Sequence, residues 1–401
     1  MFDLSFLKPY SDFAPAIFVA LSITLLITPL VGYLAKRFGF VDLPVSQRPR
    51  GVRSNEQRIH NSILPRIGGL AVMLSFIVVA FTSSEISAPI WGLMIGVMIL
   101  MVSGAIDDKY ELKSNTQFLF QILAAVITVI SGTSITFMQI LGVEIDLNWF
   151  SSEIFIGNFI YNFVFPADLF TILWIVTIIN ALNWVFGIDA LGEGITIITS
   201  FTIMFIAVKT GRPEIAILPA ILGASLIGYL PYNYPPSKII SGTIGTSSYG
   251  FLIAVLAMMS GAKISTAILL LTLPLFDMFW VILYRMTHFK NIPLLKRPFQ
   301  PGRVHMHHRL MSAGYTMKET LVIETSAMAV IAFIAYYFAG FGTKLLTVSI
   351  LAVIITIIAT VAVFSSKGKR KKEREKFARI EDDPPPTIIE KDISPEEKYA
   401  Y

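Results

Sequence analysis

The sequence contains no cysteine, and only 15% of its 401 residues are charged. The absence of cysteine excludes disulfide bonds, thiolate metal sites and cysteine nucleophiles. The low charge accompanies 54% hydrophobic residues, and a soluble domain of this length needs far more charged surface. The composition therefore predicts a membrane protein.

Apolar runs long enough to cross a bilayer recur along most of the chain. A span needs about 20 apolar residues, and about 11 runs approach that length. The fold class predicted is all-α, a polytopic membrane helical bundle over residues 1–365. Residues 366–401 are first strongly basic and then acidic with several prolines, which predicts a disordered cytoplasmic tail. The expected spans are 14–35, 67–83, 89–106, 116–136, 168–187, 194–209, 214–231, 247–262, 264–285, 320–340 and 343–365.

The distribution of Lys and Arg predicts the orientation of these spans. Almost all of them fall in the tail and in the segments that follow odd-numbered spans. Because cytoplasmic segments are enriched in Lys and Arg, the C-terminus is expected inside and the N-terminus outside. The net charge of +5 then belongs to the inner rim, which favours contact with anionic lipids and not with nucleic acid. The Lys and Arg residues assigned to the outer side are Lys8, Lys209, Arg212, Lys263 and Lys344.

Four polar residues near span ends on the cytoplasmic side are candidates for a site. Asp107 and Asp108 end the third span, where ionisable groups are costly and are often functional. Their alternative role is to anchor a helix end at the interface. Asn180 and Asn183 share one face of the fifth span, and their alternative role is a hydrogen bond to a neighbouring helix.

The largest cytoplasmic loop concentrates histidine. His305, His307 and His308 follow Arg303 closely, although the whole chain has only 5 histidines. A zinc site would lack cysteine or a close carboxylate. Arg and His donate charge-assisted hydrogen bonds to phosphate, so a phosphate-binding loop fits these residues better. A plain basic loop would explain the arginines but not the histidines.

The ordered motifs resemble the polyprenyl-phosphate N-acetylhexosamine-1-phosphate transferases, which belong to glycosyltransferase family 4. The resemblance extends from Thr28 to about Tyr315. It is carried by Thr28-Pro29-Leu30, Arg58-Ile59-His60, Pro65-Arg66-Ile67-Gly68-Gly69, Asp107-Asp108, Asn180-Ala181-Leu182-Asn183, Gly187-Ile188-Asp189, Leu230-Pro231-Tyr232-Asn233 with Lys238, Pro274-Leu275-Phe276-Asp277 and His305-Met306-His307-His308.

The resemblance implies that a UDP-N-acetylhexosamine donates its sugar-1-phosphate to a membrane polyprenyl phosphate such as undecaprenyl phosphate and releases UMP. It also implies Mg²⁺, with Mn²⁺ as an alternative, and an active face on the cytoplasmic side of the cell inner membrane. A homodimer is the assembly considered, although the sequence does not fix the oligomeric state. By the same resemblance the catalytic residues are Asp107, Asp108 and Asp189, the metal is held by Asn183 and Asp189, and substrates are bound by His60, Asn180, Asn183, Lys238, Arg303, His305, His307 and His308.

The chain departs from the family pattern at four of these motif positions. Phe186 and Thr243 stand where the family has aspartates, Gln117 stands where it has a lysine, and Ala190 replaces a glycine. The aspartate missing at Thr243 is implied to be the principal metal ligand, so metal binding should be weakened. Two hypotheses follow: an active transferase with a rearranged site, or an inactive relative that binds lipid phosphate or a membrane partner. A transporter is less consistent, because no inverted repeat is visible.

Overall fold

A computed structural model of the protein describes residues 8–42, 63–140, 143–156, 159–261, 264–298, 300 and 304–337. Two expected site residues, His60 and Arg303, lie outside the described residues. So do the last expected span and the tail.

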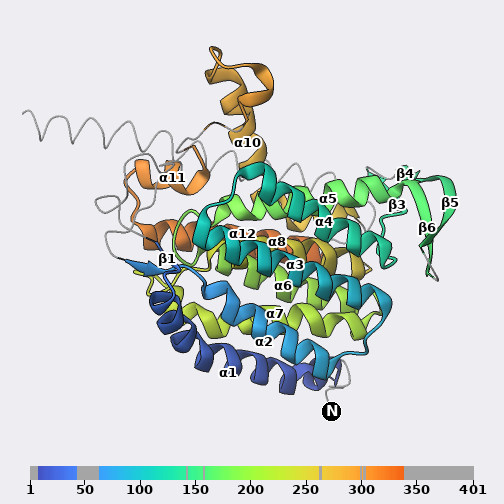
Figure 1. The fold of residues 1–401 in the computed structure, drawn as a ribbon, viewed down its shortest axis with the longest axis horizontal. Coiled ribbons are helices and arrows are strands. Elements are labelled where there is room, and N and C mark those ends of the chain that lie inside the picture. The colour runs from blue at the N-terminus through green and yellow to red at the C-terminus, as the bar shows by residue number, and fades with distance from the viewer. Residues whose placement is uncertain are drawn as a thin grey trace, which may run out of the picture.

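The described part is a bundle of long apolar helices (Figure 1). Within it, 7 helices are long and apolar enough to span a membrane, which makes the chain a multi-pass membrane protein. Two further apolar helices are shorter: α2 (Gly68–Ser83) and α4 (Ser114–Ile130). The seven are α1 (Lys8–Arg37), α3 (Ala88–Tyr110), α5 (Ala167–Val185), α6 (Leu191–Lys209), α7 (Pro213–Asn233), α8 (Gly242–Met259) and α12 (Met317–Tyr337).

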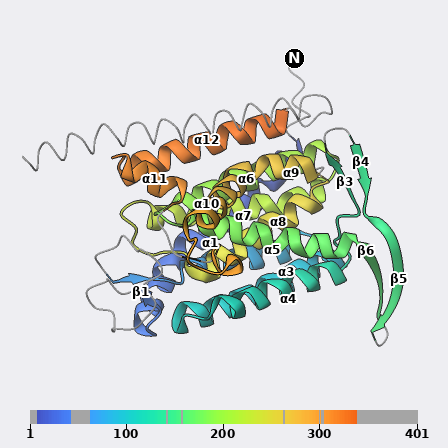
Figure 2. The same cartoon turned by 90° about the horizontal axis from the view of Figure 1, so that it is seen from above.

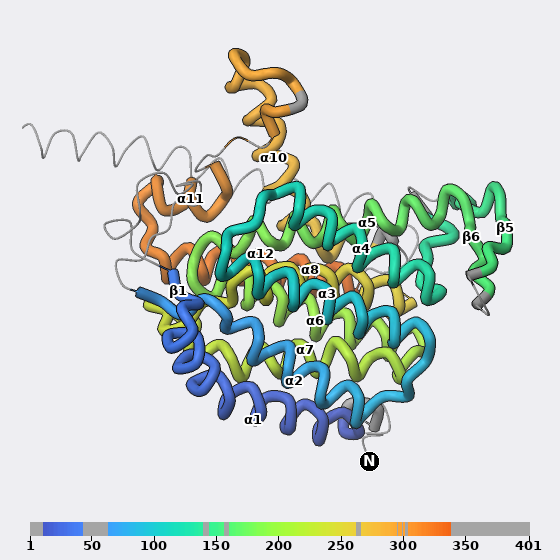
Figure 3. Tube along the Cα trace, viewed as in Figure 1, coloured from blue at the N-terminus to red at the C-terminus, as the bar shows by residue number. Residues whose placement is uncertain are grey.

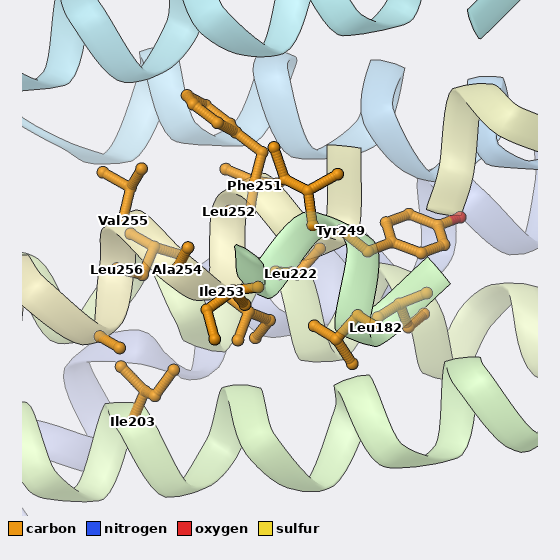
Figure 4. Packing of buried hydrophobic residues seen from close by; sticks show 14 of the residues in the cluster. Leu182, Ile203, Leu222, Tyr249, Phe251, Leu252, Ile253, Ala254, Val255 and Leu256 are labelled. Atoms are coloured by element: carbon orange, nitrogen blue, oxygen red, sulfur yellow. The ribbon is translucent and has the colours of Figure 1, made fainter. Parts of the chain in front are cut away.

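Helix α8 forms the centre of the bundle. Every residue from Ile244 to Ala257 is buried, because α2, α3, α5, α6 and α7 all pack around it. A helix that is apolar on all sides fits such a central position. Figure 4 shows Tyr249, Phe251 and Leu252 of α8 among side chains from α5, α6 and α7. Gly250 permits close contact with α5, since a Cβ there would lie 2.7 Å from the Cα of Ile179.

The run expected as one span at 264–285 is divided into α9 (Ile264–Leu270) and α10 (Thr272–His288). Pro274 accounts for the break, because proline lacks an N–H group and its ring clashes with the carbonyl of Leu270. Helix α10 then projects from the bundle in Figure 1. After it come a short 3₁₀ turn, Leu294–Lys296, and the helix α11 (Met306–Ser312).

The structure also contains strands, which an all-α fold class omits. Strands β3 (Phe137–Ile140) and β4 (Val143–Asp146) pair antiparallel, as do β5 (Asn148–Ile156) and β6 (Phe159–Pro166). Their aromatic and β-branched residues favour strands, but a search for long apolar runs does not detect such short elements.

The two ends of the bundle differ in composition and structure. Figures 1 and 2 place the hairpins β3–β4 and β5–β6 together at one end. At the other end lie β1 (Val41–Asp42), which pairs with β2 (Leu64–Pro65), and α11. The trace in Figure 3 shows that α1, α3 and α5 all run toward this second end. The polar motifs of the sequence meet there.

Candidate active site

The carboxylate of Asp108 lies at the N-terminus of α8. It accepts hydrogen bonds from the backbone N–H groups of Thr243 (2.8 Å) and Ile244 (3.2 Å). The Nε of Arg66 lies 3.0 Å from Oδ1 of the same carboxylate. The first N–H groups of a helix have no acceptor within the helix and form the positive end of its dipole. Asp108 therefore supplies the acceptors for α8 and joins it to α3.

Asp107 is also surrounded by donors. Its Oδ1 accepts hydrogen bonds from Nε2 of Gln117 (2.6 Å) and from the backbone N–H of Leu112 (2.8 Å). Its Oδ2 accepts one from the hydroxyl of Thr243 (2.5 Å). Asp107 is buried, so these groups replace water around the carboxylate. Gln117 and Thr243, two departures from the family pattern, thus contact the same side chain.

The segment Pro65–Gly69 pairs with the segment that leads into α8. The backbone N–H groups of Gly68 and Gly69 donate to the carbonyls of Ile240 and Ser241, both at 2.9 Å. A Cβ on Gly69 would lie 2.3 Å from the backbone of Gly245, so the approach requires glycine. This pairing places Arg66 between Asp107 and Asp108.

Asp189 lies in the turn between α5 and α6. It is buried, and its Oδ2 accepts a hydrogen bond from the backbone N–H of Ser237 (2.9 Å). The next residue, Ala190, has the left-handed φ of 63°, which explains why the family has glycine there. Its N–H group donates to the Asn233 side chain (2.8 Å). The next residue after Ser237 is Lys238, which is exposed.

Asn180 and Asn183 differ in their surroundings. The side-chain amide of Asn180 donates to Oε1 of Gln121 on α4 (2.7 Å) and to the carbonyl of Val176 (2.8 Å). Asn180 therefore joins α5 to α4, which is the structural alternative given above. Asn183 lies one turn further on, is half-buried, and is nearer to the end of α5.

Asp277 of α10 holds the start of the histidine segment. One carboxylate oxygen lies 2.7 Å from Nδ1 of His305, and the other accepts the backbone N–H of Met306 at 2.7 Å. The ring of His305 also meets Trp184 of α5 edge-on, with centroids 5.5 Å apart. Asp277 and Trp184 therefore connect α11 to α10 and α5.

His307 connects the histidine segment to the Gly187–Asp189 motif. It is buried, and a Cβ on Gly187 would lie only 2.0 Å from its Nε2. Its ring centroid is 4.3 Å from that of His308. Burial, together with the neighbouring His308 and His305, lowers the pKa of His307 well below its ordinary value. His307 is therefore neutral at pH 7.

The Phe186 side chain packs inside the bundle, in space that is free because Gly192 has no side chain. Its ring lies over Gly192, where a Cβ would come within 2.3 Å of the ring, and 5.9 Å from the ring of Tyr249. Nearby, the buried Glu193 accepts a hydrogen bond from the hydroxyl of Ser241 (2.5 Å). The aromatic residue thus packs into the bundle, and a carboxylate lies on α6 beside the entry to α8.

The described side chains do not form a ready-made metal site. Among these residues, no group of three His, Asp or Glu side chains lies close enough to hold an ion. The oxygens of Asp107 and Asp108 already accept hydrogen bonds, and Thr243 is one of the donors. The expected metal ligands Asn183 and Asp189 are therefore not joined by a third ligand of these types.

The structure brings most of the expected residues to one end of the bundle. Direct contacts link Asp107 and Asp108 to Thr243, Asp189 to Ser237, and Gly187 to His307. No catalytic or binding role was predicted for Arg66 or Trp184 from the sequence. The sequence did contain a signal for Arg66, because Arg66 is the one cation of the Pro-Arg-Ile-Gly-Gly motif. This motif is expected on the same side of the membrane as Asp107 and Asp108, so an ion pair between them could have been predicted.

A family model and individual relatives among known proteins indicate the same family for this chain. The model of glycosyl transferase family 4 matches residues 90–261. A probable undecaprenyl-phosphate N-acetylglucosaminyl 1-phosphate transferase of Bacillus subtilis is 31% identical over 77% of this chain and 80% of the relative. A decaprenyl-phosphate N-acetylglucosaminephosphotransferase of Mycobacterium leprae is 26% identical over 90% and 92% of the two chains.

A third relative comes from another bacterium. An undecaprenyl-phosphate alpha-N-acetylglucosaminyl 1-phosphate transferase of Escherichia coli is 26% identical over 75% of this chain and 76% of its own. The family model spans Asp107, Asp108, Asp189 and Thr243. The chain belongs to glycosyl transferase family 4.

Proposed function

We propose that this protein transfers N-acetylhexosamine-1-phosphate from a UDP-sugar to a polyprenyl phosphate in the membrane, with UDP-N-acetylglucosamine and undecaprenyl phosphate as the first substrates to test. The observation that carries the proposal is the meeting of separate polar motifs at one end of a membrane bundle. The relatives' names describe the same transfer. The reaction would begin a cell-envelope glycan pathway.

In this reaction an oxygen of the acceptor phosphate forms a bond to the β-phosphorus of the donor. The bond from that phosphorus to the bridging oxygen breaks, and UMP leaves with the electron pair. A phosphate monoester has a second pKa near 6, so the acceptor is mostly a dianion at pH 7 and needs little activation. The protein must then position two anions and offset their charge.

We propose that positively charged and hydrogen-bonding side chains hold the phosphates. Lys238, Arg303, His60 and His308 supply donors, while the neutral His307 supports the loop from within. Asp107, Asp108 and Asp189 orient the groups around the reacting phosphates. Mg²⁺ or Mn²⁺ is proposed from the family, and the chemistry it supplies is charge neutralisation on the diphosphate. It is not placed on the described side chains, because they do not form a metal site.

The orientation completes the proposal. A UDP-sugar is made in the cytoplasm, so the end that carries the motifs should face the cytoplasm in the inner membrane. The basic inner segments would contact anionic lipids, and a homodimer is the proposed assembly. The end with the hairpins would then face outward.

The test is an assay of the purified protein in lipid nanodiscs. UMP release is expected only when UDP-N-acetylhexosamine, undecaprenyl phosphate and a divalent ion are all present. Donors that carry N-acetylglucosamine and N-acetylgalactosamine should be compared. No UMP from any donor, with tight binding of the lipid phosphate, would support the inactive relative instead.

A further inference from the structure

The carboxylate of Asp107 is held by two neutral side-chain donors from two different helices, in addition to the backbone N–H of Leu112. Gln117 comes from α4 and contacts Oδ1, whereas Thr243 comes from α8 and contacts Oδ2. Asp107 itself is at the end of α3 and is only 3% exposed. Three helices therefore meet at this single side chain.

The two donors have a specific electrostatic effect. A buried carboxylate remains charged only when hydrogen bonds replace its water, and each donor here supplies one without adding charge. Arg66 is the nearby cation, and it is bound more closely to Asp108 (3.0 Å) than to Asp107 (4.0 Å). Arg66 therefore stabilises the charge of Asp107 less than that of Asp108, and Asp107 relies more on the hydrogen bonds from Gln117 and Thr243.

We propose that Gln117 and Thr243 are paired positioning residues, which together fix the direction of the Asp107 carboxylate and are energetically coupled through it. The inference rests on the proposed function, because Asp107 is placed in its site. A carboxylate at position 243 would replace the donor with a second anion at about the same place, 2.5 Å from Oδ2 in the present side chain. A cation at position 117 would offset that anion.

The coupling would account for the two departures from the pattern that the family resemblance implies at these positions. Relative to the family pattern, Thr243 replaces an aspartate and Gln117 replaces a lysine. One negative and one positive charge are therefore missing here, so the net charge around Asp107 is unchanged. Both the neutral pair (threonine at 243 with glutamine at 117) and the charged pair (aspartate at 243 with lysine at 117) leave the Asp107 carboxylate without an uncompensated neighbouring charge. A mixed pair with aspartate at 243 and glutamine at 117 leaves two carboxylates in contact.

A double-mutant cycle in the full-length protein tests this proposal. Thr243→Asp should lower the melting temperature and reduce kcat by on the order of tenfold or more, with a smaller change in KM. Gln117→Lys alone adds a cation without the matching anion, so it should also lower the melting temperature, whereas in the Thr243→Asp background it should restore most of both losses. If Thr243→Asp gives no folded protein, recovery of folded protein in the double variant is the equivalent result.

Two controls at the same position separate charge from packing. Thr243→Ser keeps the hydroxyl donor, so it should lose less activity and less stability than Thr243→Val. Thr243→Val removes the donor without adding a charge, so Gln117→Lys should not rescue it as it rescues Thr243→Asp.

The proposal and the proposed function fail in different ways. If the effects of Thr243→Asp and Gln117→Lys on melting temperature simply add, or if both variants and their double are equally unfolded, the coupling is overturned. If the melting temperatures show the rescue but no variant or wild type releases UMP, the coupling stands and the proposed function fails.

Discussion

Arg66 is the cation that the two buried aspartates of α3 share. Removing one partner from a buried ion pair leaves uncompensated charge, at a cost of about 3 kcal/mol or more. Arg66→Ala should therefore lower the free energy of unfolding by about that amount, measured by thermal or denaturant unfolding in detergent. The control is Arg37→Ala at the exposed end of α1, which should change stability little. Equal effects of the two changes would contradict the assigned ion pair.

His307 makes stability depend on pH. Its folded-state pKa lies well below its ordinary value of 6.5, so the unfolded chain binds a proton that the folded chain rejects. Stability should therefore be greatest above pH 6.5 and should fall as the pH drops below it. The measurement is the difference in unfolding free energy between wild type and His307→Gln from pH 8 to pH 5. A difference that does not shrink toward low pH would contradict the neutral, buried His307.

At the scale of elements, the contact between the α5–α6 turn and the histidine segment depends on Gly187. A methyl group there would lie 2.0 Å from Nε2 of His307 and would force the two segments apart. Gly187→Ala should destabilise by about 1–3 kcal/mol and strongly reduce UMP release. The matched control is Gly32→Ala, where the new Cβ would be 3.6 Å from its nearest neighbour. Normal activity of Gly187→Ala would show that the two segments need not touch.

The link between α10 and α11 depends on Asp277. Its two oxygens contact Nδ1 of His305 and the backbone N–H of Met306. Asp277→Asn keeps the shape but loses the charge, so we expect a looser histidine segment and a KM for the UDP-sugar raised about tenfold. Steady-state kinetics with each substrate varied in turn would check this. An increase in the KM of the lipid alone would place the histidines on the other substrate.

The elements also show what could be predicted before the structure. Long apolar runs located the main helices, and the shared membrane side of Asp107, Asp189 and His307 predicted that they lie at the same end of the bundle. The break before Pro274 and the hairpins β3–β6 were missed, since hydropathy averages over windows longer than these features. The partners of Asp107 could not be predicted, because Gln117 and Thr243 are 126 positions apart in the chain, and only the packing of α4 and of α8 against α3 brings both residues to Asp107.

On the scale of the whole molecule, the two ends of the bundle have different tasks in this account. One end gathers the polar motifs on α3, α5, α8 and α11, and the other carries the aromatic hairpins (Figure 2). A polyprenyl phosphate in the bilayer can approach the first end from the side, and a UDP-sugar can approach it from water. The bundle thus holds a site at which a lipid and a soluble nucleotide can meet.

The most direct test of this account follows the β-phosphate of the donor. UDP-N-acetylglucosamine labelled with ³²P at the β-position is incubated with the nanodisc protein and undecaprenyl phosphate, and the lipid is extracted into butanol. Because the bond broken lies between the two phosphates, the label should enter the lipid phase in equal amount to the UMP released. Label that stays in water as UDP while the sugar enters the lipid, or no transfer at all, would contradict it.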